Sequence, residues 1–486
     1  MSPAGPGRHL APVLCLVFLL SLLAFVLFHQ IGSSGLLGPD EPRYASIGRA
    51  MSESGDWVTP QLNGKPWYEK PPLLYWLIAL GFAAGLDNDA APRVPIGLLS
   101  IIALILWTRA IAQIENLRVA AISAAILAST AGWSALSMIG VTDLPMAACF
   151  SAALAFGAAA AELDNRTALV LSGIWLGLAI LAKGLVPLVL LLPFVFWARR
   201  HWRMLLCLLG IAVAVAAPWY LLMTARHGWA FIDVFFLQHH FGRFSSEALQ
   251  HVRPFWFYIP VLLAGFFPWT PLLLLLERGP LLEPRNRVWV WTALFGLVFF
   301  SASTNKLPAY LLPLFPAICL ILARALDQAR AMGRTLAVCL FLLSLVPAIA
   351  SLLPDALLHG LSRTRLSEVH WEYFVAAAPA AVVVYLLDRF NLRLAAVTML
   401  SACSIAALLY VKLSAAPVLG EVVSARGLAR RAANNAAQTC VGQLHRNYRY
   451  GLDYYLKREL PACEAAPSAV FLITQEPGRL PRIVPR

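Results

Sequence analysis

The chain has 486 residues, of which 60% are hydrophobic and 13% are charged. Soluble globular proteins have about 45–50% apolar and about 25% charged residues, so this composition excludes an ordinary soluble protein and predicts a polytopic membrane protein. Much of the formal net charge of +13 comes from arginines at the ends of apolar runs, which is typical of a topology signal. Because no basic cluster alternates with stacking aromatic residues, nucleic acid is not an expected partner.

The first apolar run, at 10–30, is about 20 residues long and can therefore span a bilayer. A cleaved signal peptide is the alternative, but no A-x-A site follows the run and many further apolar runs do. Arg8 precedes it, which predicts a cytoplasmic N-terminus. The later long runs lie at roughly 94–112, 119–138, 144–161, 168–181, 185–198, 204–223, 255–276, 288–303, 308–323, 335–353, 371–387 and 394–413.

The short apolar run at 73–86 decides the topology. It would reach only about 21 Å as a helix, against a hydrocarbon core of about 30 Å. If it spanned the membrane, every later loop would change sides and the arginine clusters would lie outside, against the positive-inside rule. We therefore predict a re-entrant or interfacial helix on the outer face, about 13 spans, a cytoplasmic N-terminus and an outer C-terminus. The clusters are Arg199, Arg200, Arg203, Arg278, Arg285, Arg287, Arg324, Arg330, Arg334, Arg389 and Arg393.

These runs divide the chain into two expected domains. Residues 1–413 form the transmembrane domain, with a first outer loop at 31–93, and residues 414–486 form a small soluble α/β domain on the outer side. In this tail, GLDYYLKREL at 451–460 is typical of a helix and AVFLITQ at 469–475 is typical of a strand. Cys440 and Cys463 would lie in an oxidising compartment, where they can form a disulfide.

Two carboxylates stand out on the outer face. Asp40 lies in a Gly-Pro-Asp-Glu-Pro stretch, and Pro39 and Pro42 predict a turn there rather than a regular helix. Asp143 stands alone in a short polar gap between two spans, and the predicted topology places this gap on the outer face as well. Each aspartate can instead cap a helix, because Pro42 and Pro145 follow at early helical positions.

Several cations and a tyrosine accompany these carboxylates. Arg43 follows closely after the acidic pair Asp40 and Glu41. Lys70 precedes the short helix predicted at 73–86, where its side chain can either snorkel or hold a lipid phosphate. Arg243 lies in QHHFGRF, and Lys306 and Tyr310 lie in NKLPAYLLP. Taken singly, Arg243 and Lys306 are explained as positional charges, and Tyr310 can donate a hydrogen bond to a phosphate oxygen. Together the group suits a reaction on an anionic lipid.

Six motifs in this order resemble the bacterial polyprenyl-phosphate-sugar glycosyltransferases of the C-type (GT-C) fold, which are related to the protein O-mannosyltransferases. The resemblance is greatest to the aminoarabinose transferases that modify lipid A. It covers about residues 10–325, whereas the tail is shorter than in the lipid A enzymes. The motifs are PDEPRYA, GDWVTPQLNGKPWYEKPPLLYW, VTDLP, LAKG at 181–184, FFLQHHFGRF and NKLPAYLLPLFP.

The resemblance implies an all-α fold of about 13 transmembrane helices, with juxtamembrane helices in the first periplasmic loop and a small periplasmic C-terminal domain. It also implies roles for the matching residues. Asp40 matches the catalytic aspartate of the first loop, and Asp143 matches a second acidic residue that faces it. Arg43 and Lys70 match the residues that hold the lipid phosphate, and Tyr310 joins them.

A divalent metal such as zinc or magnesium is a further candidate. Glu69 with one histidine of QHHFGRF resembles a metal site of the lipid A enzymes. His239 and His240 are adjacent, and adjacent helical side chains point about 100° apart, which argues against both binding one ion from a helix. Hydrogen bonding at the membrane interface is the alternative role for these histidines.

We therefore expect a monomeric glycosyltransferase of the bacterial inner membrane. It would transfer a sugar such as 4-amino-4-deoxy-L-arabinose from undecaprenyl phosphate to lipid A or a related lipid on the periplasmic face, with inversion. The same donor chemistry with a protein or surface-glycan acceptor is one alternative. A transporter or flippase for a lipid-linked sugar is another, but it would require ionisable residues near span centres and two symmetric halves. The spans are nearly free of charge, and the sequence shows no two-half symmetry.

Overall fold

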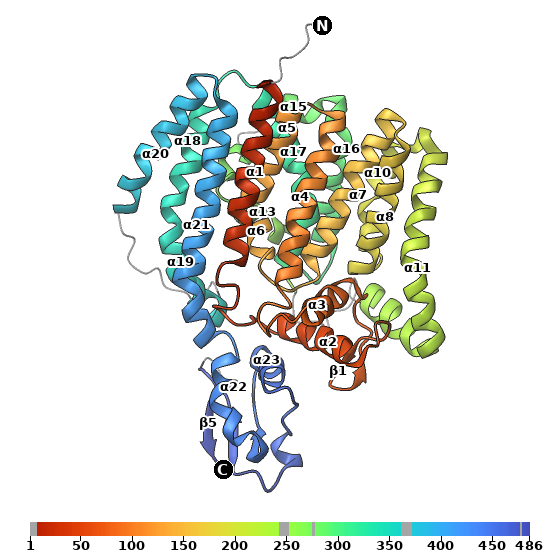
Figure 1. Ribbon diagram of the computed structural model, residues 1–486, viewed down its shortest axis with the longest axis vertical. Helices are drawn as coiled ribbons and strands as arrows, with labels where there is room; N and C mark the ends of the chain where they lie inside the picture. Colours follow the sequence, from red (N-terminus) through yellow and green to blue (C-terminus); the bar gives the residue numbers. More distant parts are fainter. Residues whose placement is uncertain (1–6, 243–251, 275–277, 361–371, 477–478) are drawn as a thin grey trace.

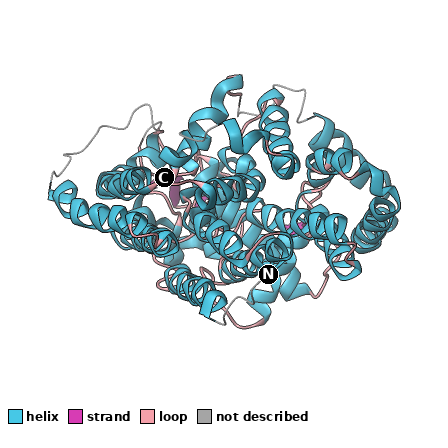
Figure 2. Ribbon diagram, turned by 90° about the horizontal axis from the view of Figure 1, so that it is seen from above, coloured by secondary structure: helices cyan, strands magenta, loops and turns pink. Residues whose placement is uncertain are grey.

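Long helices run side by side and form a bundle in the computed structural model, which describes residues 7–242, 252–274, 278–360, 372–476 and 479–486 (Figure 1). Seen from above, the molecule is helical almost throughout (Figure 2). The helices of the first half are α1 (Gly7–Phe28), α2 (Asp40–Ser54), α3 (Leu73–Ala83), α4 (Val94–Ile114), α5 (Leu117–Ser129), α6 (Ala131–Leu136), α7 (Asp143–Leu163), α8 (Arg166–Lys183), α9 (Val186–Leu190), α10 (Leu192–Trp197), α11 (Trp202–Ile232) and η2 (Asp233–Gly242).

The second half continues the bundle and ends in the tail. Its main helices are α13 (Tyr258–Gly265), α14 (Thr270–Leu274), α15 (Arg278–Leu282), α16 (Arg287–Ala302), η5 (Pro308–Leu314), α17 (Phe315–Gln328), α18 (Gly333–Phe341), α19 (Val346–His359), α20 (Glu372–Arg389), α21 (Arg393–Val422), α22 (Arg426–Ala432) and α23 (Arg446–Leu456). Short 3₁₀ segments lie at Arg199–His201, Phe255–Phe257, Pro284–Asn286, Leu342–Leu345, Ala433–Gln438 and Cys463–Ala465.

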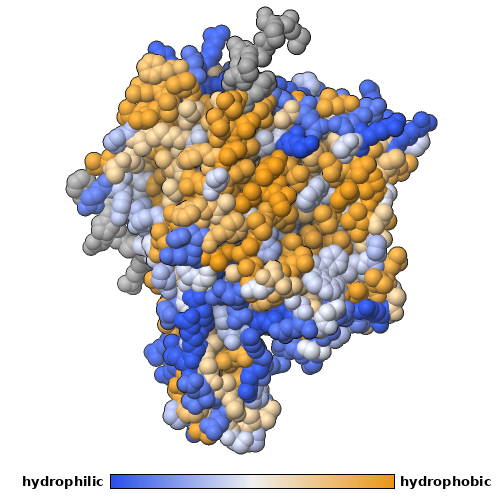
Figure 3. Space-filling model, in the orientation of Figure 1, coloured by the Kyte–Doolittle hydropathy of each residue, from blue (hydrophilic) through white to orange (hydrophobic). Residues whose placement is uncertain are grey.

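Eight helical stretches in the described parts of the chain are long and apolar enough to cross a membrane, by length and composition. Several other predicted runs are divided into two short helices, such as 185–198 into α9 and α10. The expected number of about 13 spans therefore stays a prediction. Apolar surface covers much of the bundle, and hydrophilic residues gather over the tail and the first loop (Figure 3).

Helix α7 lies inside the bundle, as its burial shows: 94% of the residues in its most apolar 18-residue stretch are buried. Its sequence, DLPMAACFSAALAFGAAAAEL, is dominated by small residues, which allow neighbouring helices to approach closely. At Gly157 a Cβ atom would come within 2.9 Å of the Phe194 ring of α10. This buried helix begins at Asp143, so the packing of the core fixes where that carboxylate lies.

The run at 73–86 forms a short helix, as predicted. Helix α3 has only 11 residues and packs against α2 across one end of the bundle, opposite to the end where α15 lies (Figure 1). The two helices approach closely at Gly48, where a Cβ atom would lie 2.4 Å from a methyl carbon of Ile78. The predicted turn at Asp40 is wrong, because α2 begins at this residue. Pro42 is tolerated since the N–H groups of the first helical turn have no intrahelical partner.

The tail is a small α/β unit, and its predicted helix and strand are confirmed as α23 and β4 (Phe471–Thr474). Strand β4 pairs in parallel with β3 (Thr439–Val441) and antiparallel with β5 (Arg482–Pro485). A two-stranded hairpin, β1 (Gln61–Leu62) and β2 (Lys65–Pro66), lies in the first loop. Cys440 and Cys463 form the anticipated disulfide. Helix α21 extends to Val422, across the expected domain boundary at residue 414.

The tail is bound tightly to the first loop through α23. The Arg49 guanidinium donates a 2.9 Å hydrogen bond to the Tyr454 carbonyl and lies 3.9 Å from the centroid of the Tyr454 ring. The Tyr455 hydroxyl donates to Asp89 at 2.6 Å, and Arg426 forms a 2.8 Å ion pair with the same carboxylate. These contacts fix the face of α23 that is turned toward α2.

Asp453 makes the stability of the tail dependent on pH. Burial raises the pKa of Asp453 from 3.8 to about 6, although Arg449 partly opposes the change. Because the folded state favours the protonated carboxyl, its stabilisation is complete below pH 3.8 and is lost as pH rises through about 6. We expect this to reduce the free energy of unfolding by up to about 3 kcal/mol between pH 4 and pH 7.5.

Thermal melting of the purified protein at several pH values, with Asp453→Asn for comparison, measures this effect. The Asn variant should lose part of the decrease in melting temperature between pH 4 and pH 7.5. An identical decrease in both proteins would show that Asp453 does not contribute to it.

Candidate active site

A cavity of about 380 Å³ lies where the first loop, the start of α7, the end of α8, η5 and α23 meet. We call it the donor cavity. Its charged and hydrogen-bonding side chains come from segments far apart in the sequence, and seven of these thirteen residues are acidic or basic. They are Asp40, Arg43, Tyr44, Glu69, Lys70, Thr142, Asp143, Lys183, Asn305, Tyr310, Arg446, Asn447 and Tyr450.

Asp40 and Arg43 form an ion pair at the start of α2. An Arg43 Nη2 donates a 2.6 Å hydrogen bond to Asp40 Oδ1, and the Asp40 side chain is 44% exposed, whereas that of Arg43 is 13% exposed. The positive end of the helix dipole favours a carboxylate at this position. Burial opposes the charge of Arg43, but Tyr44 and Asp40 outweigh it and keep the pKa of the guanidinium above its ordinary value. Arg43 is therefore a fixed cation beside an accessible carboxylate.

Aromatic rings hold the Arg43 guanidinium in place. Its central carbon lies 5.2 Å from the ring centroids of Tyr44 and Trp67 and 5.4 Å from that of Tyr450. Cation–π contacts of this kind orient a guanidinium without using its N–H donors. The Nε atom of Arg43 is buried and has no hydrogen-bond partner among the described residues. Arg43, which lines the donor cavity, is thus held in place by its ring contacts and by its ion pair with Asp40.

Asp143 is the first residue of α7, and it pairs with a cation that is not among the predicted site residues. Lys183 Nζ lies 2.5 Å from Asp143 Oδ1, and the ammonium is 4.2 Å from the ring centroid of Tyr310. Lys183 is the last residue of α8 and belongs to the LAKG motif. A lone lysine at the end of an apolar run, on the same side as Asp143, is the signal that could have identified it.

The remaining predicted residues divide into two groups. Glu69 and Lys70 line the donor cavity, and Lys70 Nζ donates a 3.3 Å hydrogen bond to the Glu69 carbonyl. Lys306 does not line it; its buried Nζ donates to the backbone carbonyls of Ser303 and Arg253. Lys306 therefore stabilises its own loop by hydrogen bonds to two backbone carbonyls.

The predicted metal site cannot be assembled from the described residues. The side chains of its histidine candidates, His239 and His240, lie outside them, although the backbone of both belongs to η2. Arg243, which is predicted to bind the donor phosphate and not the metal, also lies outside the described residues. Among the side chains that the structure describes, no group of three or more His, Cys, Asp or Glu is placed to hold a metal ion. The proposal of a zinc or magnesium ion at Glu69 with a histidine therefore stays a prediction.

A buried ion pair fixes the two halves of the site relative to each other. Glu41 accepts hydrogen bonds from Arg93 Nε at 2.7 Å and Nη2 at 2.8 Å, and both side chains are at most 3% exposed. Glu41 Oε1 also accepts from the Gly140 backbone N–H at 3.0 Å. The start of α2, which carries Asp40, is thereby tied to the turn that leads into Asp143. Glu41 is thus a positioning residue beside the cavity.

The tail also contributes residues to the cavity, although none of them is among the predicted site residues. Arg446, Asn447 and Tyr450 all lie on α23 and line the donor cavity. Their contribution depends on the contacts between α23 and the first loop, which join residues more than 350 positions apart in the sequence. No local motif carries this information.

Residues 69–222 match a family model described as dolichyl-phosphate-mannose-protein mannosyltransferase. An undecaprenyl phosphate-alpha-4-amino-4-deoxy-L-arabinose arabinosyl transferase of Pseudomonas aeruginosa is 36% identical over 339 residues, which are 65% of this chain and 61% of the relative. A similar protein of Sodalis glossinidius is 33% identical over 63% of this chain and 58% of its own length. The chain thus matches only about 60% of the length of these relatives.

Solved structures extend the similarity to the whole fold. The crystal structure of ArnT from Cupriavidus metallidurans bound to undecaprenyl phosphate has a TM-score of 0.73 and 27% identity, and the match covers 94% of this chain and 86% of that one. The oligosaccharyltransferase AglB of Archaeoglobus fulgidus has a TM-score of 0.51 at 15% identity, over 94% of this chain and 65% of its own, and shows the fold alone. The chain is therefore similar to ArnT over most of a shared GT-C fold, and to the arabinosyl transferases in sequence over about 60% of their length.

Proposed function

We propose that the protein is a glycosyltransferase of the inner membrane that transfers a sugar from undecaprenyl phosphate to lipid A or a related lipid on the periplasmic face. The sugar would be an amino sugar such as 4-amino-4-deoxy-L-arabinose, as the names of its relatives suggest. The observation that carries the proposal is one cavity in which two separate carboxylates, Asp40 and Asp143, lie among several cations. The phosphate and sugar of a lipid-linked donor would occupy this cavity, while its polyprenyl tail stays in the bilayer.

The cations suit a phosphate leaving group. As the glycosidic bond breaks, negative charge grows on the phosphate oxygens, and fixed cations stabilise that charge where it develops. Arg43 is held by aromatic rings and Lys70 lines the same cavity, so both can bind the phosphate without a large rearrangement. Tyr310, whose ring contacts the Lys183 ammonium, can donate a further hydrogen bond.

The carboxylates suit the sugar and the acceptor. The anomeric carbon becomes oxocarbenium-like, and Asp40, the more exposed of the two, can stabilise that charge or accept a proton from the acceptor. Asp143 is neutralised by Lys183, so its proposed role is to orient a substrate. A single displacement would invert the anomeric centre. If the acceptor is itself a phosphate, little base catalysis is needed and Asp40 acts mainly by charge and position.

The proposed orientation follows from the two ends of the bundle. The donor cavity and the tail lie at the end that carries α2 and α3, and the arginine-bearing α15 lies at the other end (Figure 1). By the positive-inside rule, the cavity and the C-terminus would be periplasmic and the N-terminus cytoplasmic.

Mass spectra of lipid A from cells with and without the gene test the proposal. We expect an added pentosamine or hexosamine mass on lipid A only when the gene is present, and its loss when the gene encodes Asp40→Asn. Identical spectra with and without an expressed gene would contradict lipid A as the acceptor.

A further inference from the structure

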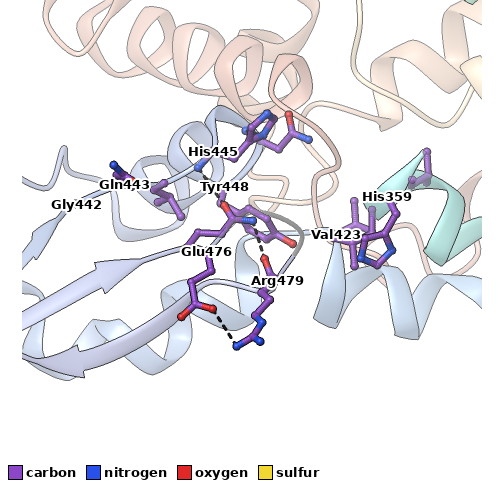
Figure 4. Close-up of a pocket in the computed structure, with 13 residues that line it drawn as sticks. His359, Val423, Gly442, Gln443, His445, Tyr448, Glu476 and Arg479 are labelled. Carbon is purple, nitrogen blue, oxygen red and sulfur yellow. Dashed lines mark hydrogen bonds and ion pairs between the residues drawn. The ribbon is translucent and has the colours of Figure 1, made fainter. Parts of the chain in front are cut away.

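A groove of about 400 Å³ lies between α10 and α16 on the side of the bundle, and we call it the lateral groove. It differs from the cavity of about 640 Å³ between the tail and the bundle, where His359 and Val423 lie on one side and Gln443 and His445 on the other (Figure 4). That cavity shares Asn447 with the donor cavity and so belongs to the site already described. The lateral groove shares no residue with either.

Aromatic and aliphatic side chains form the walls of the lateral groove. They are Leu192, Pro193 and Phe196 of α10 and Trp291, Leu294 and Phe295 of α16. The ring centroids of Phe196 and Trp291 lie 5.6 Å apart, and the side chains of Leu192, Phe196 and Leu294 are more than half exposed. Because the surface of the bundle here is apolar and faces the bilayer, the groove opens to lipid. Its natural ligand is therefore a hydrocarbon chain.

Arginines lie next to one end of the lateral groove. Arg199 and Arg200 follow α10, and α16 begins at Arg287. On α16, Trp291 comes four residues after Arg287, which is about one helical turn or about 5 Å along the axis. On the other wall, the Arg199 guanidinium carbon lies 4.5 Å from the ring centroid of Phe196, and Arg199 Nη1 donates a 3.0 Å hydrogen bond to the Phe196 carbonyl. Hydrophilic residues form a rim above apolar surface at this end of the bundle (Figure 3).

Several of these arginines carry a charge that no carboxylate neutralises. Among the residues that the structure describes, Arg200, Arg203 and Arg287 are exposed and form no ion pair, whereas Arg285 pairs with Glu283 at 2.8 Å. A topology signal requires positive charge in the loops, but it does not require an apolar groove beside that charge. Guanidinium groups bind phosphate oxygens through paired N–H donors. The arrangement therefore suits a ligand with both a phosphate and a hydrocarbon chain.

An anionic phospholipid matches the spacing of the two parts. The polar layer on each side of a bilayer is about 5–7 Å thick, so the phosphate and the first acyl carbons of a lipid differ in depth by about one helical turn. The arginines and the lateral groove are offset by the same amount. A zwitterionic lipid carries its own cation beside the phosphate and gains less from the unpaired arginines.

We propose that the lateral groove binds an anionic phospholipid, with its phosphate at Arg199, Arg200 and Arg287 and one acyl chain against Phe196 and Trp291. In the orientation proposed above, this lipid belongs to the cytoplasmic leaflet. The site lies at the end of the bundle that carries α15, opposite to the donor cavity (Figure 1). The inference therefore goes beyond the proposed function and does not depend on which sugar or acceptor the protein uses.

The double variant Arg200→Gln/Arg287→Gln tests the charged part of the site. Its matched control is Arg334→Gln/Arg389→Gln, which removes two exposed arginines of α18 and α20 that lie away from the groove. Native mass spectrometry of the full-length proteins in detergent gives dissociation constants for phosphatidylglycerol and for phosphatidylcholine with the same acyl chains. We expect wild type and the control to prefer phosphatidylglycerol by about tenfold or more, and Arg200→Gln/Arg287→Gln to lose most of this preference.

Leu192→Trp tests the apolar part, because a larger side chain at this exposed position fills the groove without entering the core. Val213→Trp is its control, since Val213 is similarly exposed on α11 and does not line the groove. We expect Leu192→Trp to weaken phosphatidylglycerol binding by about tenfold and Val213→Trp to leave it unchanged. Inorganic phosphate in excess should not displace the lipid, because it has no chain to occupy the groove.

These measurements use no sugar donor or acceptor, so their outcome is separate from that of the transfer assay. The inference is overturned if wild type binds the two lipids equally, or if Arg334→Gln/Arg389→Gln loses the preference to the same extent as Arg200→Gln/Arg287→Gln. It is also overturned if Leu192→Trp binds phosphatidylglycerol as wild type does, or if inorganic phosphate displaces that lipid.

Discussion

Replacement of Asp40 by asparagine should reduce sugar transfer by roughly 10²–10⁴-fold while the protein still folds and inserts. The amide keeps the size of the side chain and can still accept the hydrogen bond from Arg43, so the start of α2 should keep its structure. The negative charge beside the anomeric carbon is lost. Initial rates of transfer by purified protein, with undecaprenyl-linked aminoarabinose as donor and lipid A as acceptor, measure the effect.

Asp56→Asn is the matched control for this variant. Asp56 lies in the same first loop and pairs with Arg226 at 2.8 Å, but it does not line the donor cavity. Its rate should remain within about twofold of wild type, since a surface ion pair contributes about 0–1 kcal/mol. Wild-type activity in Asp40→Asn, with both variants equally folded, would refute the role of Asp40.

The second large effect is expected at Glu41, through stability. Glu41→Gln leaves the Arg93 guanidinium buried without its counter-charge, and breaking a buried ion pair in this way costs about 3–5 kcal/mol. The same change loosens the link to Gly140, which places Asp143 relative to Asp40. We expect a lower melting temperature and a lower yield of folded protein, together with reduced transfer by the molecules that do fold.

Glu53→Gln provides the comparison, because Glu53 lies on the same helix and is exposed. Thermal melting of the three proteins in the same detergent should give similar temperatures for wild type and Glu53→Gln and a lower one for Glu41→Gln. If all three melt together, the buried pair does not stabilise the fold as described.

The helical architecture could be predicted from hydrophobic runs, because a segment that crosses a membrane must be apolar along its length and must satisfy its own backbone hydrogen bonds as a helix. The positive-inside rule predicted that the segment 73–86 lies at one end of the bundle and does not cross it, and α3 lies at that end. The turn expected at Asp40 is wrong because Pro39 and Pro42 do not break this helix. In fact Pro39 precedes the helix and Pro42 lies in its first turn, where proline removes no hydrogen bond.

The site was only partly predictable, for a different reason. Asp40 and Arg43 are three residues apart, so their proximity follows from the sequence, and Lys70 belongs to the same first loop. Lys183 and the residues of α23 reach the cavity only through tertiary packing, which no local pattern records. Glu41 is adjacent to Asp40 in the sequence, but successive residues of a helix point in different directions, and Glu41 faces the core instead of the cavity.

Donor recognition at Lys70 is the step on which the proposed reaction depends, and it can be measured without an acceptor. The direct measurement is the dissociation constant of the purified protein for undecaprenyl phosphate, compared between wild type, Lys70→Ala and the control Lys65→Ala, an exposed lysine of the same loop. A charge-assisted hydrogen bond contributes about 1.5–3 kcal/mol, so Lys70→Ala should weaken binding by at least about tenfold. Lys65→Ala should bind as wild type does. Equal affinity in Lys70→Ala and wild type would contradict the assignment of this cavity to the lipid-linked donor.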